Sequence, residues 1–520
     1  MSEINILWAD DEIDMLKPLR IFLEKKGYRV HMVSNGYDAI ELLKENGKID
    51  LVFLDESMPG LSGLETLSQI KDFRSDIPVV MITKNEAETI MDEAIGSQIA
   101  DYLIKPVNPH QILLSLKKII DNKRLVGEKT NSDYQQEFRN LLMEINSGPD
   151  LDGWVDIYKK LVSWELKLGG SQSEQMMDIL AMQKKEANAE WSKYVSKNYM
   201  DWIEPSNDEA PVMSHNLMRN YILPEMEEGV PTIIVLMDNM RYDQWKIIEP
   251  ILREKFYLEK EKHFLSILPT TTQYSRNAIF AGMMPADIQK RFPDKWLNDQ
   301  DEGGKNMYEE DFFKDQLGRL VRRDLKSHYV KVTRHHFGKQ LTEKMNNFLD
   351  NDLTVIVYNF IDMLSHARTE MEVLKELASD ESAYRSITKS WFLHSPLWAG
   401  LQRIADKKVK IIFTTDHGTI RVSTPSRVIG DKDTTTNLRY KVGKNLRYQK
   451  NDVLDLRDPL EAGLPRPNIS STFIFAKEDK FFLYPNNYNH YHNYYQDTFQ
   501  HGGISLEEMI CPLGVLTSKV

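Results

Sequence analysis

Short apolar runs alternate with amphipathic stretches in the first part of the chain. The runs are Asn5–Ala9, Val30–Ser34, Leu51–Leu54, Val79–Thr83 and Tyr102–Ile104. Five strands that alternate with helices predict a parallel sheet, because the connection between two parallel strands is usually a helix. We therefore predict a doubly wound α/β domain over residues 1–122.

Residues 123–225 have a different pattern. The stretch is rich in Glu, Lys, Gln, Met and Leu, and its apolar residues recur at helical spacing. The spacing is clear in Trp154, Ile157, Tyr158, Leu161 and Trp164. We predict a helical-bundle linker between two α/β domains.

Strand signals return from Pro231 and predict a second α/β domain over residues 226–520. The apolar runs are Thr232–Met237, Phe264–Leu268, Val330–Thr333, Thr354–Asn359 and Lys410–Thr414. Polar residues follow four of these runs directly. Ligands of parallel sheets bind just beyond the carboxyl ends of the strands, so these polar residues are candidate site residues.

Composition limits the classes of protein that remain. A chain of 520 residues is too long for one ordinary core, and its 41% hydrophobic and 28% charged content is typical of globular proteins. No apolar run approaches the roughly 18 to 20 residues that span a bilayer, so we expect no membrane insertion. The N-terminal MSEINILWADDE is acidic and predicts no secretory signal.

One cysteine, Cys511, excludes an internal disulfide and a cysteine-based zinc site. We therefore expect a cytoplasmic protein. The net charge of −12 argues against a DNA-coating surface, and sequence-specific DNA binding is not expected.

Five polar residues follow strands of the first domain. Asp10 and Asp11 follow the first strand, Asp55 ends the third, Thr83 ends the fourth and Lys105 follows the fifth. Three carboxylates can hold Mg²⁺ through oxygen, and Asp55 is placed to attack a phosphoryl group. The lysine and the hydroxyl would then hold the phosphate oxygens.

This pattern, with the DESMPGLSG motif, resembles the response-regulator receiver family, whose fold is flavodoxin-like. The resemblance implies phosphorylation at Asp55, with Thr83 and Lys105 as the switch pair and Tyr102 at the aromatic switch position. The alternative is that exposed acids and a lone lysine decorate loops, which explains each residue singly better than it explains five in register.

The second domain carries carboxylates, imidazoles and hydroxyls after its strands, without sulfur. They are Asp238, Thr270–Thr272, Asp362, His366, Asp416, His417 and, near the C-terminus, His501. Carboxylate with imidazole suits Zn²⁺ or Mn²⁺ better than Mg²⁺ alone. Taken singly, Asp238 reads as a helix cap and Asp362 with His366 as a surface pair on one helical face.

The set resembles the alkaline phosphatase superfamily, and within it the PglZ-type branch. The resemblance implies two metals that clamp an in-line phosphoryl transfer. One would be bound by Asp238, Asp416, His417 and the nucleophile, and the other by Asp362, His366 and His501. His490 and His492 compete with His501, but HGGIS-LEE resembles the closing metal motif of the family.

The same resemblance selects the nucleophile among Thr270, Thr271 and Thr272. In the superfamily the nucleophile begins a helix that runs to a glycine, commonly ten positions on, and Gly282 then selects Thr272. Ser275 and Arg276 stand where the sulfatase branch has a Ser-Arg pair. We interpret Ser275, Arg276 and also Arg241, in the DNMR segment, as candidate substrate contacts.

Two segments suggest a nucleotide substrate. The basic residues Arg421, Arg427, Arg439, Lys441, Lys444, Arg447 and Lys450 follow Asp416–His417. Tyr488, Tyr491, Tyr494 and Tyr495 are candidates for stacking on bases. A solvated charged loop and a packed aromatic turn are the alternatives. No third metal set is evident, which favours diester cleavage over monoester cleavage.

A receiver, a helical linker and a PglZ-type hydrolase in this order resemble the PorX-like regulators of type IX secretion and gliding in Bacteroidetes. The resemblance implies a PorY-like histidine kinase as phosphodonor and zinc-dependent phosphodiesterase activity on cyclic or linear oligonucleotides. It also implies a homodimer promoted by phosphorylation. Alternatives are a non-catalytic transcriptional regulator or scaffold, and a phosphomonoesterase.

Overall fold

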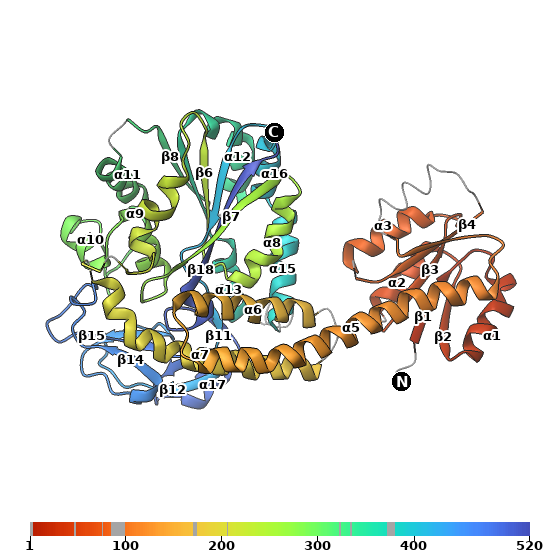
Figure 1. Ribbon diagram of the computed structural model, residues 1–520, viewed down its shortest axis with the longest axis horizontal. Helices are drawn as coiled ribbons and strands as arrows, with labels where there is room; N and C mark the ends of the chain where they lie inside the picture. The colour runs from red at the N-terminus through yellow and green to blue at the C-terminus, as the bar shows by residue number, and fades with distance from the viewer. Residues whose placement is uncertain are drawn as a thin grey trace. The chain divides into compact units, whose positions relative to one another are not determined.

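The computed structural model describes residues 4–520 apart from 46–47, 75, 85–98, 170–173, 205, 208, 322–323, 333–334 and 372–379 (Figure 1). The chain divides into two compact units, residues 1–132 and 133–520.

The first unit is a five-stranded parallel sheet with strand order β2-β1-β3-β4-β5. Its strands are β1 (Ile4–Ala9), β2 (Tyr28–Val33), β3 (Leu51–Asp55), β4 (Val79–Thr83) and β5 (Asp101–Ile104). Helices α1 (Lys17–Lys25), α2 (Gly36–Glu45) and α3 (Gly63–Phe73) connect the first four strands. The predicted doubly wound sheet is confirmed, in the strand order of flavodoxin-like folds.

Apolar side chains cover both faces of this sheet and form two separate clusters. Trp8 belongs to one of them, where it is fully buried and its ring centroid lies 4.9 Å from that of Phe53. The bulky residue before the acidic pair is therefore a core residue.

Three long helices follow: α5 (Pro109–Asn146), α6 (Leu151–Gly169) and α7 (Glu174–Ile203). Residues of α6 and α7 belong to the same apolar cluster as the C-terminal sheet. Tyr158 of α6, for example, lies 5.7 Å from Tyr242 between ring centroids. Helices α6 and α7 share one core with residues of the α/β domain, so the structure has two compact units, and the division into three domains stays a prediction from the sequence.

The second unit is built on a six-stranded mixed sheet with order β7-β18-β10-β6-β9-β8. The strands are β6 (Thr232–Met237), β7 (Phe256–Leu265), β8 (Ser327–Val332), β9 (Leu353–Tyr358), β10 (Lys410–Thr414) and β18 (Ile510–Ser518). Strands β10, β6, β9 and β8 are parallel, and β18 runs antiparallel between β10 and β7. The carboxyl ends of β10, β6, β9 and β8 therefore meet at one edge of the sheet.

Helices lie on both sides of this sheet, with α9 and α11 on one side and α8 and α15 on the other (Figure 1). The helices of this part are α8 (Tyr242–Arg253), α9 (Asn277–Ala281), α10 (Pro285–Arg291), α11 (Glu309–Leu320), α12 (His335–Lys344), α13 (Phe360–Glu370), α15 (Glu381–Leu393), α16 (Pro396–Ile404), α17 (Tyr488–Tyr495) and α18 (Leu506–Met509). Among the described residues, no helix is both long and apolar enough to cross a membrane.

Three small sheets complete the unit. They pair β11 (Ile420–Arg421) with β17 (Phe499–Gln500), β12 (Thr424–Arg427) with β16 (Lys480–Leu483), and β13 (Tyr440–Gly443) and β14 (Val453–Leu456) with β15 (Thr472–Ala476).

Several predicted strands differ from the structure by one or two residues at their ends, and two differ by more. The predicted strand Phe264–Leu268 overlaps only the last two residues of β7, which begins at Phe256 and ends at Leu265. The predicted strand Val330–Thr333 is β8, and Thr333 lies outside the described residues.

Candidate metal centre and phosphoacceptor site

Three neighbouring parallel strands of the second unit bring the predicted ligands together. Asp238 follows β6, Asp416 follows β10, and Asp362 lies on α13 just after β9. Because β10, β6 and β9 are adjacent in the sheet, these carboxylates converge at its carboxyl edge.

The first group consists of Asp238, Asp416 and His417, with one ligand atom of each within 4.8 Å of the others. His417 Nε2 lies 3.9 Å from Asp238 Oδ1 and 3.8 Å from Asp416 Oδ2. On the other side of its ring, His417 Nδ1 lies 3.0 Å from the Gly418 carbonyl oxygen. Nδ1 therefore donates to this oxygen, which leaves the lone pair of Nε2 free to bind a metal.

The donors of this group fit a divalent cation. Asp416 Oδ1 accepts from the amides of Asn239 and His417, whereas the buried Oδ2 has no hydrogen-bond partner among the described residues. Burial and the nearby Asp238 raise the pKa of Asp416 well above its usual value, and burial lowers the pKa of His417. A buried oxygen without a donor beside a neutral imidazole is the arrangement that a metal satisfies.

The second group consists of Asp362, His366 and His501. Asp362 Oδ1 lies 3.5 Å from His366 Nε2 and 3.7 Å from His501 Nε2. Burial, with Asp238 nearby, raises the pKa of Asp362 to about 6. Burial and the adjacent histidines lower the pKa of His501 well below its usual value, so the imidazole is neutral, as a ligand must be.

The two groups adjoin. The rings of His417 and His501 stack with centroids 4.5 Å apart. Asn239 connects the groups, because its amide donates to Asp416 and its side chain donates to Asp362 Oδ1 at 3.4 Å. Both groups therefore belong to one centre.

The three adjacent threonines have different surroundings. Thr272 Oγ1 donates to Asp238 Oδ1 at 3.1 Å and lies 3.2 Å from His417 Nε2. The Thr270 hydroxyl donates to the Gly503 carbonyl and accepts from the Gly502 amide. Thr271 Oγ1 is buried without a hydrogen-bond partner in the described part of the chain. The hydroxyl that faces the first group is thus that of Thr272.

Thr272 begins a helical segment, as the sequence predicts. A turn of π-helix covers Thr272–Arg276, α9 continues it, and Gly282 ends it in the left-handed conformation with φ of 62°. A side chain at Gly282 would also meet Gln316, so glycine is required there on two counts.

Ser275 and Arg276, the candidate substrate contacts, bind other residues of the protein, and their role toward a substrate stays a prediction. Ser275 is buried, with its hydroxyl 2.7 Å from that of Ser266. Arg276 is 1% exposed and binds Asp238 Oδ2 and Glu309 Oε1, each at 2.5 Å. Its positive charge therefore stabilises the carboxylate of Asp238, a predicted metal ligand.

Arg241 is likewise committed to other residues. Its guanidinium donates to both oxygens of Asp243, at 2.9 and 2.6 Å, and lies 3.0 Å from Glu381. The side chain is buried and its charge is balanced by these carboxylates, so nothing in the structure adds support for Arg241 as a substrate contact, and that role stays a prediction.

The basic stretch is only partly a surface. Arg439 and Lys441 are buried, and Arg439 binds Glu508 with two hydrogen bonds at 3.1 and 2.6 Å. Glu508 Oε1 in turn accepts from the Gly503 amide at 2.9 Å and so fixes the loop after His501. The sequence analysis missed Glu508, although it lies in the HGGIS-LEE motif. Tyr491 and Tyr494 are exposed on α17 and remain candidates for stacking.

The first unit brings its own predicted site together. Asp10, Asp11 and Asp55 each place a carboxylate oxygen within 4.8 Å of the others. Lys105 Nζ lies 2.9 Å from both Asp10 Oδ2 and Asp55 Oδ1. Burial, with Asp10 nearby, raises the pKa of Asp55 although Lys105 opposes the shift. This crowding fits a divalent cation.

The predicted switch residues Thr83 and Tyr102 lie on the neighbouring strands β4 and β5. Thr83 is the last residue of β4, and its hydroxyl donates to Glu56, the residue that follows Asp55. Tyr102 lies on β5 and packs, half-buried, against the core under α2 and α3. Their positions at neighbouring strands are those that the sequence predicts.

Comparison with known proteins covers nearly the whole chain. Residues 6–117 match the response regulator receiver domain, and residues 124–203 match the PorX response regulator linker domain. Residues 217–516 match the BREX system PglZ alkaline phosphatase-like domain. The chain therefore has a PorX-like architecture.

Individual relatives match shorter parts. The transcriptional regulatory protein ZraR of Klebsiella oxytoca is 37% identical over 194 residues, 34% of this chain and 44% of that protein. The transcriptional regulatory protein SrrA of Staphylococcus aureus (strain NCTC 8325 / PS 47) is 30% identical over 116 residues, 22% of this chain and 47% of that protein. The chain thus spans less than half the length of these relatives.

Among solved structures, a CheY-like receiver domain protein from Methanospirillum hungatei JF-1 is similar, with 26% identity and a TM-score of 0.23 over 23% of this chain and 96% of that one. A receiver domain protein from Clostridium thermocellum has 29% identity and a TM-score of 0.23 over 24% of this chain and 98% of that one. Because the match over residues 217–516 takes in more than half of the sequence, the chain belongs to the PglZ alkaline phosphatase-like family, with a response-regulator receiver domain at its N-terminal end.

Proposed function

We propose that this protein is a zinc-dependent phosphodiesterase whose output is controlled by phosphorylation of Asp55. The observation that carries the proposal is the pair of adjoining ligand groups beside the Thr272 hydroxyl, which lies 3.1 Å from Asp238 and 3.2 Å from His417. Few structural roles require two groups of carboxylates and imidazoles around one hydroxyl.

In this proposal Asp238, Asp416, His417 and Thr272 hold one Zn²⁺, and Asp362, His366 and His501 hold a second. Mn²⁺ suits the same donors and is the alternative ion. When bound, the two cations offset charge on the attacking and leaving oxygens of an in-line phosphoryl transfer.

The residues of the chain orient the reactants. Thr272 Oγ1 is the nucleophile and is held toward the ligands by Asp238 and His417. The hydrogen bond from His417 Nδ1 to Gly418 fixes the imidazole, and the Glu508 carboxylate fixes the loop that carries His501. Attack of Thr272 Oγ1 on the phosphorus would break the bond to one ester oxygen, the hydroxyl proton of Thr272 would pass to solvent, and the displaced alkoxide would take a proton from solvent and leave as an alcohol. Water would then cleave the threonine–phosphate bond, which regenerates Thr272 and releases a phosphomonoester.

Diesters are the favoured substrates. Within the part of the chain that the structure describes, the second unit has one other cluster of carboxylates that could hold a metal, formed by Glu165, Asp243 and Glu381. Buried arginines and a lysine neutralise this cluster, which argues against a third metal. Arg276 is bound to Asp238 and Glu309, so it does not supply the extra positive charge that a monoester dianion needs. The exposed Tyr491 and Tyr494 support cyclic or linear oligonucleotides as substrates.

The receiver supplies the control. A PorY-like histidine kinase would phosphorylate Asp55 in the cytoplasm, with Mg²⁺ held by Asp10, Asp11 and Asp55, and Lys105 would bind the phosphate oxygens. We propose that phosphorylation, through the Thr83 and Tyr102 switch, promotes a homodimer and changes hydrolase output in type IX secretion and gliding. Sedimentation of the phosphorylated and Asp55→Ala forms tests the dimer, and identical assembly in both would contradict it.

Metal analysis and paired ester assays test the hydrolase. We expect about two bound Zn²⁺ per chain and faster turnover of bis-para-nitrophenyl phosphate than of para-nitrophenyl phosphate. Thr272→Val should lose this turnover while keeping the fold, because the shapes of the side chains match. Thr271→Val is the matched control and should retain it.

The opposite results identify the alternatives. Faster turnover of the monoester favours a phosphomonoesterase. No turnover of either ester, together with binding of promoter DNA at physiological salt, favours a transcriptional regulator or scaffold. An active Thr272→Val protein removes Thr272 from the nucleophile position.

A further inference from the structure

A second acidic cluster lies in the hydrolase unit, away from the proposed metal centre. Glu165, Asp243 and Glu381 place carboxylate oxygens within 4.8 Å of one another. Three cations fill this cluster: the buried Arg241 and Arg385, and the mostly buried Lys184. It is therefore an ion network between the linker helices and the catalytic domain and not a further metal site.

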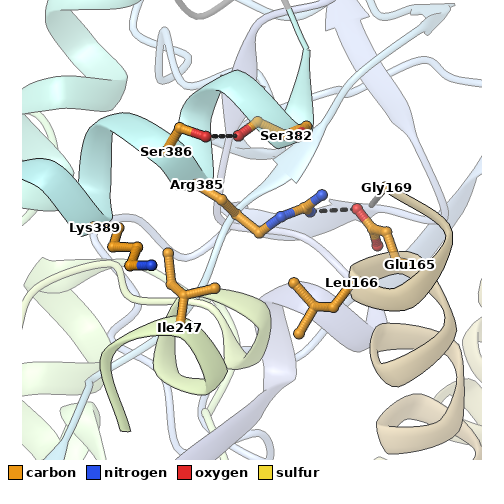
Figure 2. A pocket seen from close by; sticks show the side chains of 8 residues that line it. All are labelled: Glu165, Leu166, Gly169, Ile247, Ser382, Arg385, Ser386 and Lys389. Carbon is orange, nitrogen blue, oxygen red and sulfur yellow. Dashed lines mark hydrogen bonds and ion pairs between the residues drawn. The ribbon is translucent and has the colours of Figure 1, made fainter. Parts of the chain in front are cut away.

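One branch of the network leads from α6 to the loop after β6. Arg385 of α15 points across to Glu165 of α6 and pairs with it (Figure 2). The same guanidinium nitrogen of Arg385 donates to Asp243 at 3.0 Å, and Asp243 holds Arg241. Arg241 lies three residues after Asp238, so this branch ends beside a predicted metal ligand.

A second branch leads from α7 to α18. Lys184 Nζ lies 2.9 Å from Glu165 and 3.6 Å from Glu507. Asn188 donates to Glu507 at 3.0 Å and accepts from the Leu506 amide at 2.8 Å. Two residues of α7 therefore hold both the side chain and the backbone at the start of α18.

The short helix α18 is in direct contact with two ligand loops. The Gly418 amide donates to the Glu508 carbonyl at 3.1 Å, and a side chain at Gly418 would meet the Glu507 carbonyl oxygen at 2.0 Å. Gly418 follows His417 directly. On its other side, Glu508 accepts from the amide of Gly503, two residues after His501. A shift of α18 must therefore move the backbone beside both histidines.

We propose that Lys184 and Asn188 of the linker helix α7 are positioning residues of the metal centre, because they hold α18 against the loops that carry His417 and His501. The inference rests on the proposed metal-dependent function. It makes the linker a part of the active-site architecture as well as a connection to the receiver.

The ion pairs of Lys184 hold α7 against three other helices. The side chain of Lys184 is 16% exposed and faces carboxylates from three elements: Glu165 on α6, Glu381 on α15 and Glu507 on α18. Without the Lys184 charge, Glu165 keeps Arg385 and Glu381 keeps Arg241, whereas Glu507 has no other ion-pair partner among the described residues. The contact between α7 and α18 should therefore weaken most. Residues that orient metal ligands without touching the metal typically change its affinity by about 10- to 100-fold when they are replaced.

The test uses the full chain, zinc competition with a chromogenic chelator, and the visible absorption of the Co²⁺-loaded protein, which reports ligand geometry. We expect Lys184→Met and Asn188→Ala to weaken zinc binding by about tenfold and to change the Co²⁺ spectrum. Lys184→Arg keeps the charge and should recover part of the affinity. Lys185→Met is the matched control, because Lys185 is 56% exposed and pairs with Asp479.

Each outcome decides between the proposals. Wild-type affinity and spectrum in folded Lys184→Met and Asn188→Ala overturn this inference and leave the proposed function intact. If Lys184→Met does not fold, Asn188→Ala decides, because it removes two hydrogen bonds and no charge. If the wild type binds neither Zn²⁺ nor Co²⁺, the proposed function fails and this inference fails with it.

Discussion

Arg276 offers a sharp test of the charge balance at the proposed metal centre. Its buried guanidinium binds Asp238 and Glu309 at 2.5 Å and lies 3.8 Å from Asp416. Glu309 has further partners, since Lys331 Nζ lies 2.8 Å away and the Tyr329 hydroxyl 2.6 Å away. Methionine fills a similar space but carries no charge. Because Glu309 keeps other partners, Arg276→Met deprives chiefly Asp238 of its compensating positive charge.

The size of the effect depends on whether metal is present. In the metal-free protein, Arg276→Met leaves Asp238 buried with little compensation, and breaking a buried pair in this way costs about 3–5 kcal/mol. With zinc bound, the divalent cation offsets the missing charge on Asp238, so the loss of stability is smaller. Because the thermodynamic cycle closes, Arg276→Met must then bind zinc more tightly, about tenfold for each 1.4 kcal/mol by which the two losses differ.

Urea unfolding with and without zinc, followed by tryptophan fluorescence, measures both losses, and chelator competition measures the zinc affinity. Arg291→Met is the control, because Arg291 is an exposed arginine that pairs with Asp315, and its loss should be small in both states. Equal destabilisation of Arg276→Met with and without zinc, at unchanged zinc affinity, would refute the reasoning. That result would mean that Asp238 does not hold the metal.

Three further predictions concern other parts of the chain. Asp55→Asn should take up no phosphoryl group from acetyl phosphate in a phosphate-affinity gel, and a shifted band in this variant would contradict Asp55 as acceptor. Trp8→Ala should destabilise the receiver by about 3–5 kcal/mol in thermal or urea unfolding, because Trp8 is fully buried against Phe53; an unchanged midpoint would contradict its core role. Burial lowers the pKa of His263 to about 3, so the unfolded chain binds a proton below pH 6.5 that the folded protein does not, and stability falls as the pH drops toward 3. At pH 5 the loss of stability caused by His263 is about 2 kcal/mol. His263→Gln should therefore lose less stability between pH 7 and pH 5 than the wild type does. Identical losses in the two proteins would count against the buried neutral histidine.

Residues at the carboxyl ends of strands could be predicted from the sequence. Asp55, Asp238 and Asp416 each come directly or almost directly after an apolar run, and parallel strands bring such positions to one edge. The strand itself fixes where the residue lies, so local pattern is sufficient. The same logic placed Thr83 and Lys105 beside Asp55.

Partners that are distant in the sequence could not be predicted in this way. Arg241 and Arg276 look like phosphate-binding residues, yet Arg276 pairs with Glu309 on a different helix, and Arg241 with Glu381 far along the chain. Burial of a guanidinium depends on which carboxylates the tertiary fold brings to it, and a local pattern does not contain that information. The apolar core that α6 and α7 share with the hydrolase sheet could not be predicted for the same reason.

This difference separates the proposed ligands into two classes. Asp238 and Asp416 are held by adjacent parallel strands, so their positions are fixed by the ladder hydrogen bonds of β6 and β10. His501 stands on an irregular segment, which depends on contacts from Thr270 and Glu508. A ligand of the second class moves when its supporting contacts move, whereas a ligand at a strand end does not. Any signal that adjusts the proposed metal centre should therefore act on the irregular segments, and α18, held by the linker, is one element that contacts them.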